Sequence, residues 1–98
     1  MLVLPLAARV DERRLASMLH TGRSRVRLAP AASLVPLCGY TVGNVPPFGH
    51  RSRLPVIVDA SVPAFDSCYA GGGSDKAEVL IAVPELLRAT GATVADIA

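Results

Sequence analysis

Aromatic residues, lysine and long apolar runs are all scarce in this sequence. Phe and Tyr together make up 4% of the 98 residues, and tryptophan is absent, so no aromatic platform is available for stacking single-stranded nucleic acid. No apolar run approaches the roughly 20 residues of a transmembrane helix. The apolar start, residues 1–8, lacks the basic segment of a signal peptide. These absences predict a cytoplasmic protein with no membrane partner.

Cysteine and histidine are also few. Cys38 and Cys68 form no CxxC motif. With His20 and His50 included, no pair of these residues has the spacing typical of zinc ligands. We therefore expect two reduced thiols and neither a metal nor another cofactor. Cys38 and His50 flank a glycine-rich stretch, which leaves a thiol nucleophile with a histidine base as an alternative, although no third orienting group stands at a recognisable spacing.

Aliphatic residues and arginine dominate what is present. Hydrophobic residues make up 51% and charged residues 18% of the chain, which favours one folded domain, residues 1–98, over disorder. Most arginines fall in residues 1–53 and most acids in residues 54–98, although the net charge is only +2. A one-sided basic half is typical of a protein that binds a polyanion. A solvated, arginine-rich surface is the alternative.

Strand and helix signals interleave along the chain. Apolar runs and alternating patterns predict strands at 2–7, 25–29, 54–58, 68–70, 78–83 and 93–97. Periodicity and terminal residues predict helical segments at 13–20, 30–37, 63–67 and 84–90. Asp11 is expected to cap the first helix, Pro36 to end the second and Gly91 to end the last. The pattern predicts a mixed α/β domain.

Glycine and proline are concentrated in residues 39–49. Glycine permits positive φ, and proline stiffens the chain and removes N–H donors. A rigid loop of this kind binds a carbonyl oxygen or an oxyanion through its remaining N–H groups, and a purely structural loop is the alternative. The later glycine run, residues 71–76, lacks the frame of a phosphate-binding P-loop, and no serine lies in a GxSxG motif.

Several short motifs, taken in order, resemble one known family. The stretch GYTVGNVPPFG (39–49), followed by LPVIVD (54–59), resembles the loop and strand of the YbaK/prolyl-tRNA synthetase-associated domain family. Weaker matches follow the same order: VD and LA within 10–16, RLA at 27–29, YAGGG at 69–73 and ADIA at 95–98. The resemblance covers essentially the whole sequence.

The resemblance implies a fold and an activity. The fold would be mixed α/β, with a barrel-like β-sheet flanked by short helices. The activity would be trans-editing: hydrolysis of the ester between a tRNA and a wrong amino acid, here prolyl-tRNA carrying a small residue such as alanine or cysteine. The partners would be the aminoacylated 3′ end of tRNA and prolyl-tRNA synthetase. A tRNA- or protein-binding module with the same fold and impaired catalysis is the alternative.

The resemblance also assigns site residues. The substrate-binding residues would be Gly43, Asn44, Val45, Pro46, Pro47, Phe48, Gly49, Gly72 and Glu78. We expect four basic residues to face the tRNA, namely Arg23, Arg25, Arg51 and Arg53.

No catalytic residue is assigned, because the family's lysine has no match in this sequence. That lysine belongs to a strand before residues 1–6, and Lys76 lies in a later glycine turn. We therefore expect the first helix and strand of the family fold to be missing. The loss would expose a strand edge through which copies of the chain could associate.

Overall fold

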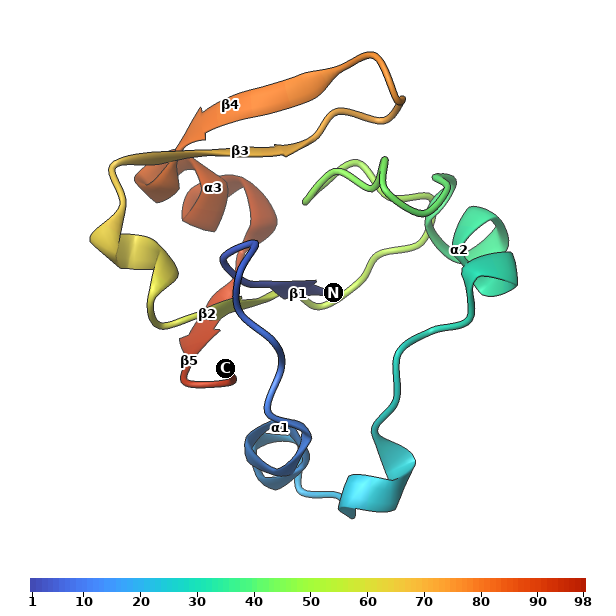
Figure 1. Cartoon of the computed structure of the whole chain (residues 1–98), viewed down its shortest axis with the longest axis vertical. Helices are drawn as coiled ribbons and strands as arrows, with labels where there is room; N and C mark the ends of the chain where they lie inside the picture. The colour runs from blue at the N-terminus through green and yellow to red at the C-terminus, as the bar shows by residue number, and fades with distance from the viewer.

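The parallel sheet joins three segments that lie far apart in the sequence. In the computed structural model, which describes residues 1–98, β1 (Leu2–Val3), β2 (Ile57–Asp59) and β5 (Thr93–Ala95) pair in the order β1-β2-β5 (Figure 1). Leu2 lies opposite Ile57, and Ile57 lies opposite Thr93. All three residues of β2 are buried, as expected for the central strand of a parallel sheet.

A second sheet is a hairpin of β3 (Ser67–Gly71) and β4 (Glu78–Ala82). Tyr69 and Leu80 face each other on its exposed side. Figure 1 shows α3 (Val83–Thr90) between this hairpin and the parallel sheet. Val83 and Leu86 of α3 pack in one core with Val56, Val58 and Val62. The mixed α/β fold is confirmed, with its strands divided between two small sheets.

Local signals at the helix ends are confirmed. The helix α1 (Glu12–Met18) begins at Asp11, whose carboxylate accepts hydrogen bonds of 3.0 and 3.2 Å from the N–H groups of Arg13 and Arg14. The helix α3 has Pro84 in its first turn and ends at Gly91, where φ is +61°. A 3₁₀ turn, Val62–Ala64, overlaps only the start of the third predicted helical segment, 63–67, and Ser67 already belongs to β3. None of the helices combines the length and the apolar character needed to cross a membrane.

The predicted end of the second helix at Pro36 is wrong. The helix α2 (Ala31–Cys38) contains Pro36 and ends at Gly39, where φ is +89°. A proline in a helix removes one N–H and crowds the carbonyl four residues earlier. Here that carbonyl belongs to Ala32, in the exposed first turn, where it can tilt into water.

The strand predicted at residues 25–29 is also wrong. A 3₁₀ turn, Arg23–Arg25, precedes a segment with no strand partner, and the Leu28 side chain is exposed. Alternation describes a side-chain pattern, but a strand also needs a neighbour for its backbone. The strands predicted at 2–7 and 54–58 are likewise shorter or shifted: β1 ends before a turn at residues 5–8, and β2 begins only at Ile57.

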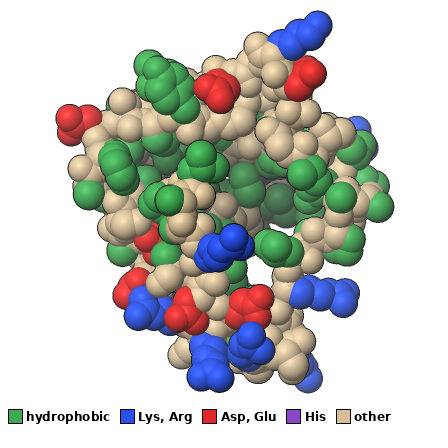
Figure 2. All heavy atoms as spheres, viewed as in Figure 1, with side chains coloured by type: hydrophobic (Ala, Val, Ile, Leu, Met, Phe, Trp, Pro, Cys, Tyr) green, Lys and Arg blue, Asp and Glu red, His purple; other side chains and the backbone are tan.

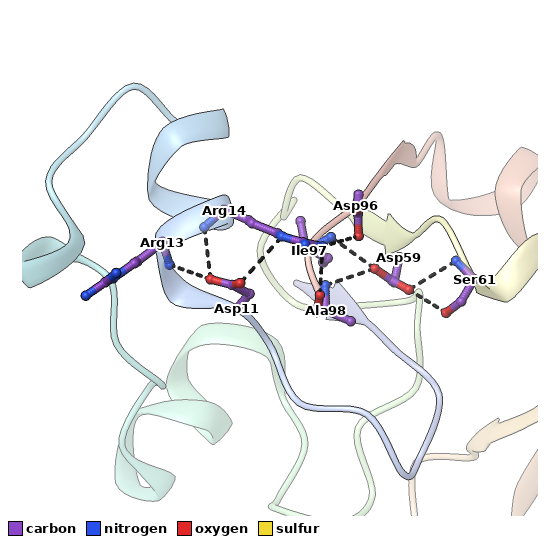
Figure 3. A network of polar contacts seen from close by, with 8 residues as sticks. All are labelled: Asp11, Arg13, Arg14, Asp59, Ser61, Asp96, Ile97 and Ala98. Carbon is purple, nitrogen blue, oxygen red and sulfur yellow. Dashed lines mark hydrogen bonds and ion pairs between the residues drawn. The ribbon is translucent and has the colours of Figure 1, made fainter.

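Polar contacts hold the last four residues against β2 and α1 (Figure 3). The buried carboxylate of Asp59 accepts hydrogen bonds from Ile97 N and Ala98 N, each 3.0 Å, and from the N–H and hydroxyl of Ser61. The Ser61 hydroxyl and these backbone donors lower the pKa of Asp59 to about 2. Arg14 binds Asp96 at 2.7 Å from the α1 side. Ile97 is thereby held in a second core with Leu15 and Ile57.

Candidate functional site

The loop between α2 and β2 begins with a tight turn. The N–H of Asn44 donates to the carbonyl of Thr41 at 3.1 Å, and the Asn44 amide donates to the Thr41 hydroxyl at 2.7 Å. Positive φ angles of +85° at Gly43 and +77° at Gly49 mark the two ends of the predicted substrate loop. No atom lies near the place of a Cβ at Gly43, so glycine is needed there for its backbone angle and not for space.

The glycine run at the end of β3 packs directly on this loop. A Cβ on Gly71 would lie 2.4 Å from the carbonyl oxygen of Val45, and the N–H of Gly73 donates to the carbonyl of Asn44 at 3.0 Å. Gly72 instead faces its own hairpin, where a Cβ would lie 2.6 Å from Ala77. The structure therefore brings together the two glycine-rich segments that the sequence singled out.

Side chains bind two more carbonyl groups of the loop. Nε2 of His50 lies 2.7 Å from the carbonyl oxygen of Pro46. The hydroxyl of Tyr40 donates to the carbonyl of Gly49 at 3.1 Å. Together with Gly73 N, these donors bind three of the seven carbonyl oxygens of the loop, those of Asn44, Pro46 and Gly49.

The loop N–H groups other than that of Asn44 are, in contrast, free. No hydrogen bond of the structure uses the N–H groups of Gly43, Val45, Phe48, Gly49 or His50. Pro46 and Pro47 have no N–H. A backbone segment with several unused N–H groups and part of its oxygens bound elsewhere is suited to bind an external carbonyl oxygen or oxyanion.

Two cavities adjoin the loop. The first, of about 230 Å³, is lined almost wholly by hydrophobic side chains from β1, β3 and the loop, including Val45 and Pro47. A hollow lined with hydrophobic side chains is visible on the face drawn in Figure 2. The second cavity, of about 610 Å³, lies between residues 47–54 and the end of α3. Pro47 lines both, so the two cavities approach each other at this residue of the loop.

The larger cavity is basic. Arg51 and Arg53 line it, and so does Arg88 from the last turn of α3. No sequence pattern selected Arg88, because only the packing of α3 places it opposite the loop. Its guanidinium is also paired with Glu85, with 3.0 Å between Nε and the carboxylate. We name the larger cavity, with its three arginines, the basic cleft.

The other predicted tRNA-facing residues lie elsewhere. Arg23 and Arg25 belong to the 3₁₀ turn beside α1 and do not line the basic cleft. Arg23 pairs with Glu12 at 3.2 Å. Figure 2 shows acidic and basic side chains side by side at the end of the molecule that carries α1. The predicted basic half is thus divided between two places and is partly neutralised at one of them.

Lys76 and Glu78 are exposed in the β3–β4 hairpin and line neither cavity. The Cys38 thiol is buried and donates to the carbonyl of Leu34 at 3.1 Å. It makes no hydrogen bond to His50, whose Nε2 contacts Pro46. The thiol–histidine alternative therefore lacks the required contact. No group of three or more metal-binding side chains occurs.

Comparisons with known proteins identify relatives of this arrangement. The sequence model of the family described as aminoacyl-tRNA editing domain matches residues 1–89. A candidate trans-editing enzyme for prolyl-tRNA synthetase is 31% identical with a TM-score of 0.82, and 91% of this chain is covered. The hypothetical protein APE2540 is 33% identical with a TM-score of 0.86, and 98% of this chain is covered.

A scaffold protein for presenting linear epitopes is similar as well. It is 31% identical, with a TM-score of 0.83 and 93% of this chain covered. The chain spans 55–63% of the length of these three solved structures. The family match over residues 1–89 and these structural matches agree: the chain belongs to the aminoacyl-tRNA editing domain family.

Proposed function

We propose that this chain is a trans-editing deacylase, which hydrolyses the ester between a tRNA and a small wrong amino acid, with prolyl-tRNA as the tRNA. The observation that carries the proposal is the loop at residues 43–49, in which three carbonyl oxygens are bound within the protein and the N–H groups of Gly43, Val45, Phe48 and Gly49 are free. Membership of the editing family supports the reaction class. The similarity to a candidate trans-editing enzyme for prolyl-tRNA synthetase supports the choice of tRNA.

In the proposed reaction the loop stabilises the oxyanion that forms on the substrate. Water adds to the ester carbonyl carbon, the carbonyl oxygen becomes negative, and free N–H groups such as those of Val45 and Phe48 donate to it. The oxyanion then re-forms the carbonyl as the ester C–O bond breaks, the ribose oxygen takes the proton lost by the attacking water, and the free amino acid leaves. Removing one such donor typically costs about 10²–10³ in rate.

In this proposal each of the two cavities binds a different part of the substrate. We assign the phosphates of the tRNA 3′ end to the basic cleft, where Arg51 and Arg53 supply bidentate donors. We assign the amino-acid side chain to the hydrophobic cavity beside Val45 and Pro47, whose volume of about 230 Å³ suits a small residue. One methylene is worth only about 1–3 kcal/mol in such a pocket, so this cavity would favour small side chains without excluding all others.

The remaining predicted contacts lie further from the loop. Gly72 and Glu78 belong to the hairpin whose glycine run packs on the loop, and we assign them to the outer edge of the substrate site. Arg23 and Arg25 would contact a part of the tRNA beyond the 3′ end. We expect the reaction to take place in the cytoplasm beside prolyl-tRNA synthetase. The free edge of β1 remains the predicted place where two copies would associate.

One observation favours the alternative of a binding module without catalysis. Lys76 is the only lysine of the sequence, and it lies exposed in the hairpin turn, outside both cavities. The loop therefore offers neutral dipoles with no lysine ammonium beside it. Charge-assisted hydrogen bonds are about twice as strong as neutral ones, so a chain of this kind would hydrolyse slowly or only bind.

Single-turnover hydrolysis separates these two functions. The 98-residue chain is mixed in excess with alanyl-tRNA(Pro), cysteinyl-tRNA(Pro) or correctly charged prolyl-tRNA(Pro), and the loss of ester and the bound fraction are both measured. Faster loss of the two mischarged forms supports editing. Binding without hydrolysis supports the module, and an absence of both overturns the proposal.

A further inference from the structure

We infer that Tyr40 and His50 are positioning residues, which bind carbonyl oxygens of the loop and so keep its peptide units in the orientation that leaves the N–H groups free. This inference rests on the proposed function of the loop N–H groups. Tyr40 follows Gly39 at the end of α2, and His50 follows Gly49 at the other end of the loop. Their rings meet edge to face, with centroids 6.4 Å apart and planes at 77°. The pair therefore joins the two ends of the segment.

Each ring binds a carbonyl oxygen of the loop. The Tyr40 hydroxyl donates to Gly49 O at 3.1 Å, and His50 Nε2 lies 2.7 Å from Pro46 O, a contact that requires the proton on Nε2. In a trans peptide the C=O and the following N–H point in opposite directions. Binding Gly49 O toward Tyr40 therefore directs the N–H of His50 away from it. Binding Pro46 O toward His50 fixes the Pro46–Pro47 peptide, which has no N–H.

The third oxygen contact completes the arrangement. Gly73 N donates to Asn44 O at 3.0 Å, which directs the N–H of Val45 away from the hairpin. The Tyr40 ring lies against the same glycine, because a Cβ on Gly73 would be 3.2 Å from its Cε1. Tyr40 thus contacts both the glycine run and the far end of the loop. Without these contacts the peptide units could rotate and present oxygens, which would repel a developing oxyanion.

His50 lines the basic cleft and is the histidine nearest the proposed chemistry, so a role as general base is the competing explanation. Its Nε2 is already engaged with Pro46 O, and the ring is half-buried. With the proton on Nε2, the basic lone pair of the imidazole lies on Nδ1, so His50 would act as a base only through Nδ1. The contact between Nε2 and Pro46 O is that of a positioning residue, and the variants of His50 separate this role from proton transfer at Nδ1.

The test combines four variants and one control with three measurements. His50→Ala removes the contact to Pro46, His50→Gln places an amide donor near the Nε2 position, His50→Asn places it near Nδ1 and out of reach, and Tyr40→Phe removes only the hydroxyl. His20→Gln, at the exposed histidine after α1, is the matched control. The measurements are single-turnover hydrolysis of alanyl-tRNA(Pro) with tRNA affinity, and NMR order parameters of the amides at residues 43–50.

We expect His50→Ala, His50→Asn and Tyr40→Phe to lower the hydrolysis rate about 10- to 100-fold, as small misplacements do, with tRNA affinity within about threefold of wild type. Loop order parameters should fall from about 0.85 toward 0.6. His50→Gln should restore both quantities, and His20→Gln should change neither.

Two results would overturn the inference: loop amides that stay rigid in His50→Ala and Tyr40→Phe, or a His50→Gln variant that is as slow as His50→Ala although its loop is ordered. The second result would assign His50 to proton transfer. If the wild-type chain hydrolyses no mischarged tRNA, the proposed function fails, and the order parameters alone then decide whether the pair holds the loop.

Discussion

The carboxylate of Asp59 accepts a 3.0 Å hydrogen bond from the backbone N–H of Ile97, across 38 positions of sequence. Asp59 ends the central strand, and Ile97 belongs to the last four residues. This contact holds the end of the chain near α1, where Ile97 packs with Leu15 and Ile57 in the second core. A buried charge at the end of the central strand therefore holds the residue that completes the second core.

Replacing that charge should destabilise the fold. In Asp59→Asn one side-chain oxygen remains to serve donors from Ser61, Ile97 and Ala98, while an NH₂ group faces backbone N–H. We expect a loss of about 2–4 kcal/mol in the free energy of unfolding, measured by urea denaturation. Asp96→Asn, which removes an exposed ion pair with Arg14, is the control and should cost less than about 1 kcal/mol. Equal losses in the two variants would contradict the role given to Asp59.

The same carboxylate predicts an acid-labile fold. Its pKa is about 2 in the folded protein against 3.8 for an ordinary aspartate. Because the folded-state pKa is the lower one, its stabilising contribution is complete above about pH 4 and is lost as the pH falls toward 2. Unfolding curves of the wild type and Asp59→Asn should converge over that interval. Curves that stay parallel would show that another group controls the acid transition.

Gly71→Ala should displace the loop. The new Cβ would lie 2.4 Å from Val45 O, so the loop must move or the hairpin must open. We expect a loss of about 1–3 kcal/mol in stability and a fall of about 100-fold in deacylation, which a misplacement near 1 Å can produce. Gly22→Ala is the control, since its nearest neighbour would be Ser24 Oγ at 3.9 Å. An unchanged hydrolysis rate in Gly71→Ala would show that the close contact between Gly71 and Val45 O is not needed for deacylation.

Rising salt concentration should weaken tRNA binding, because the arginines of the basic cleft contact phosphates. Arg51→Gln and Arg53→Gln should each lower the slope of log K against log salt by about one, because each removes a phosphate contact. Arg27→Gln, at an exposed arginine with no partner in the structure, is the control. Filter binding at several salt concentrations measures the slopes. A change in Arg27→Gln equal to the other two would mean that tRNA is bound by diffuse charge.

Sequence by itself determined the features that depend on neighbouring residues. Asp11 caps α1, Pro84 and Gly91 bound α3, and Gly43 adopts positive φ, because caps and turns are set by the backbone within a few positions. The ordered motifs of residues 39–49 and 54–59 also suffice to indicate the editing family, because they are read from adjacent residues.

Only the tertiary structure decided which segments meet. Residues 25–29 have the alternation of a strand but lack a partner, whereas β2 lies between two strands from opposite ends of the chain. The contact of Gly71 with Val45 O and the place of Arg88 in the basic cleft depend on how α3 and the hairpin pack. Such contacts join positions far apart in sequence, and their energy arises from burial and from satisfying backbone groups, which no local pattern records.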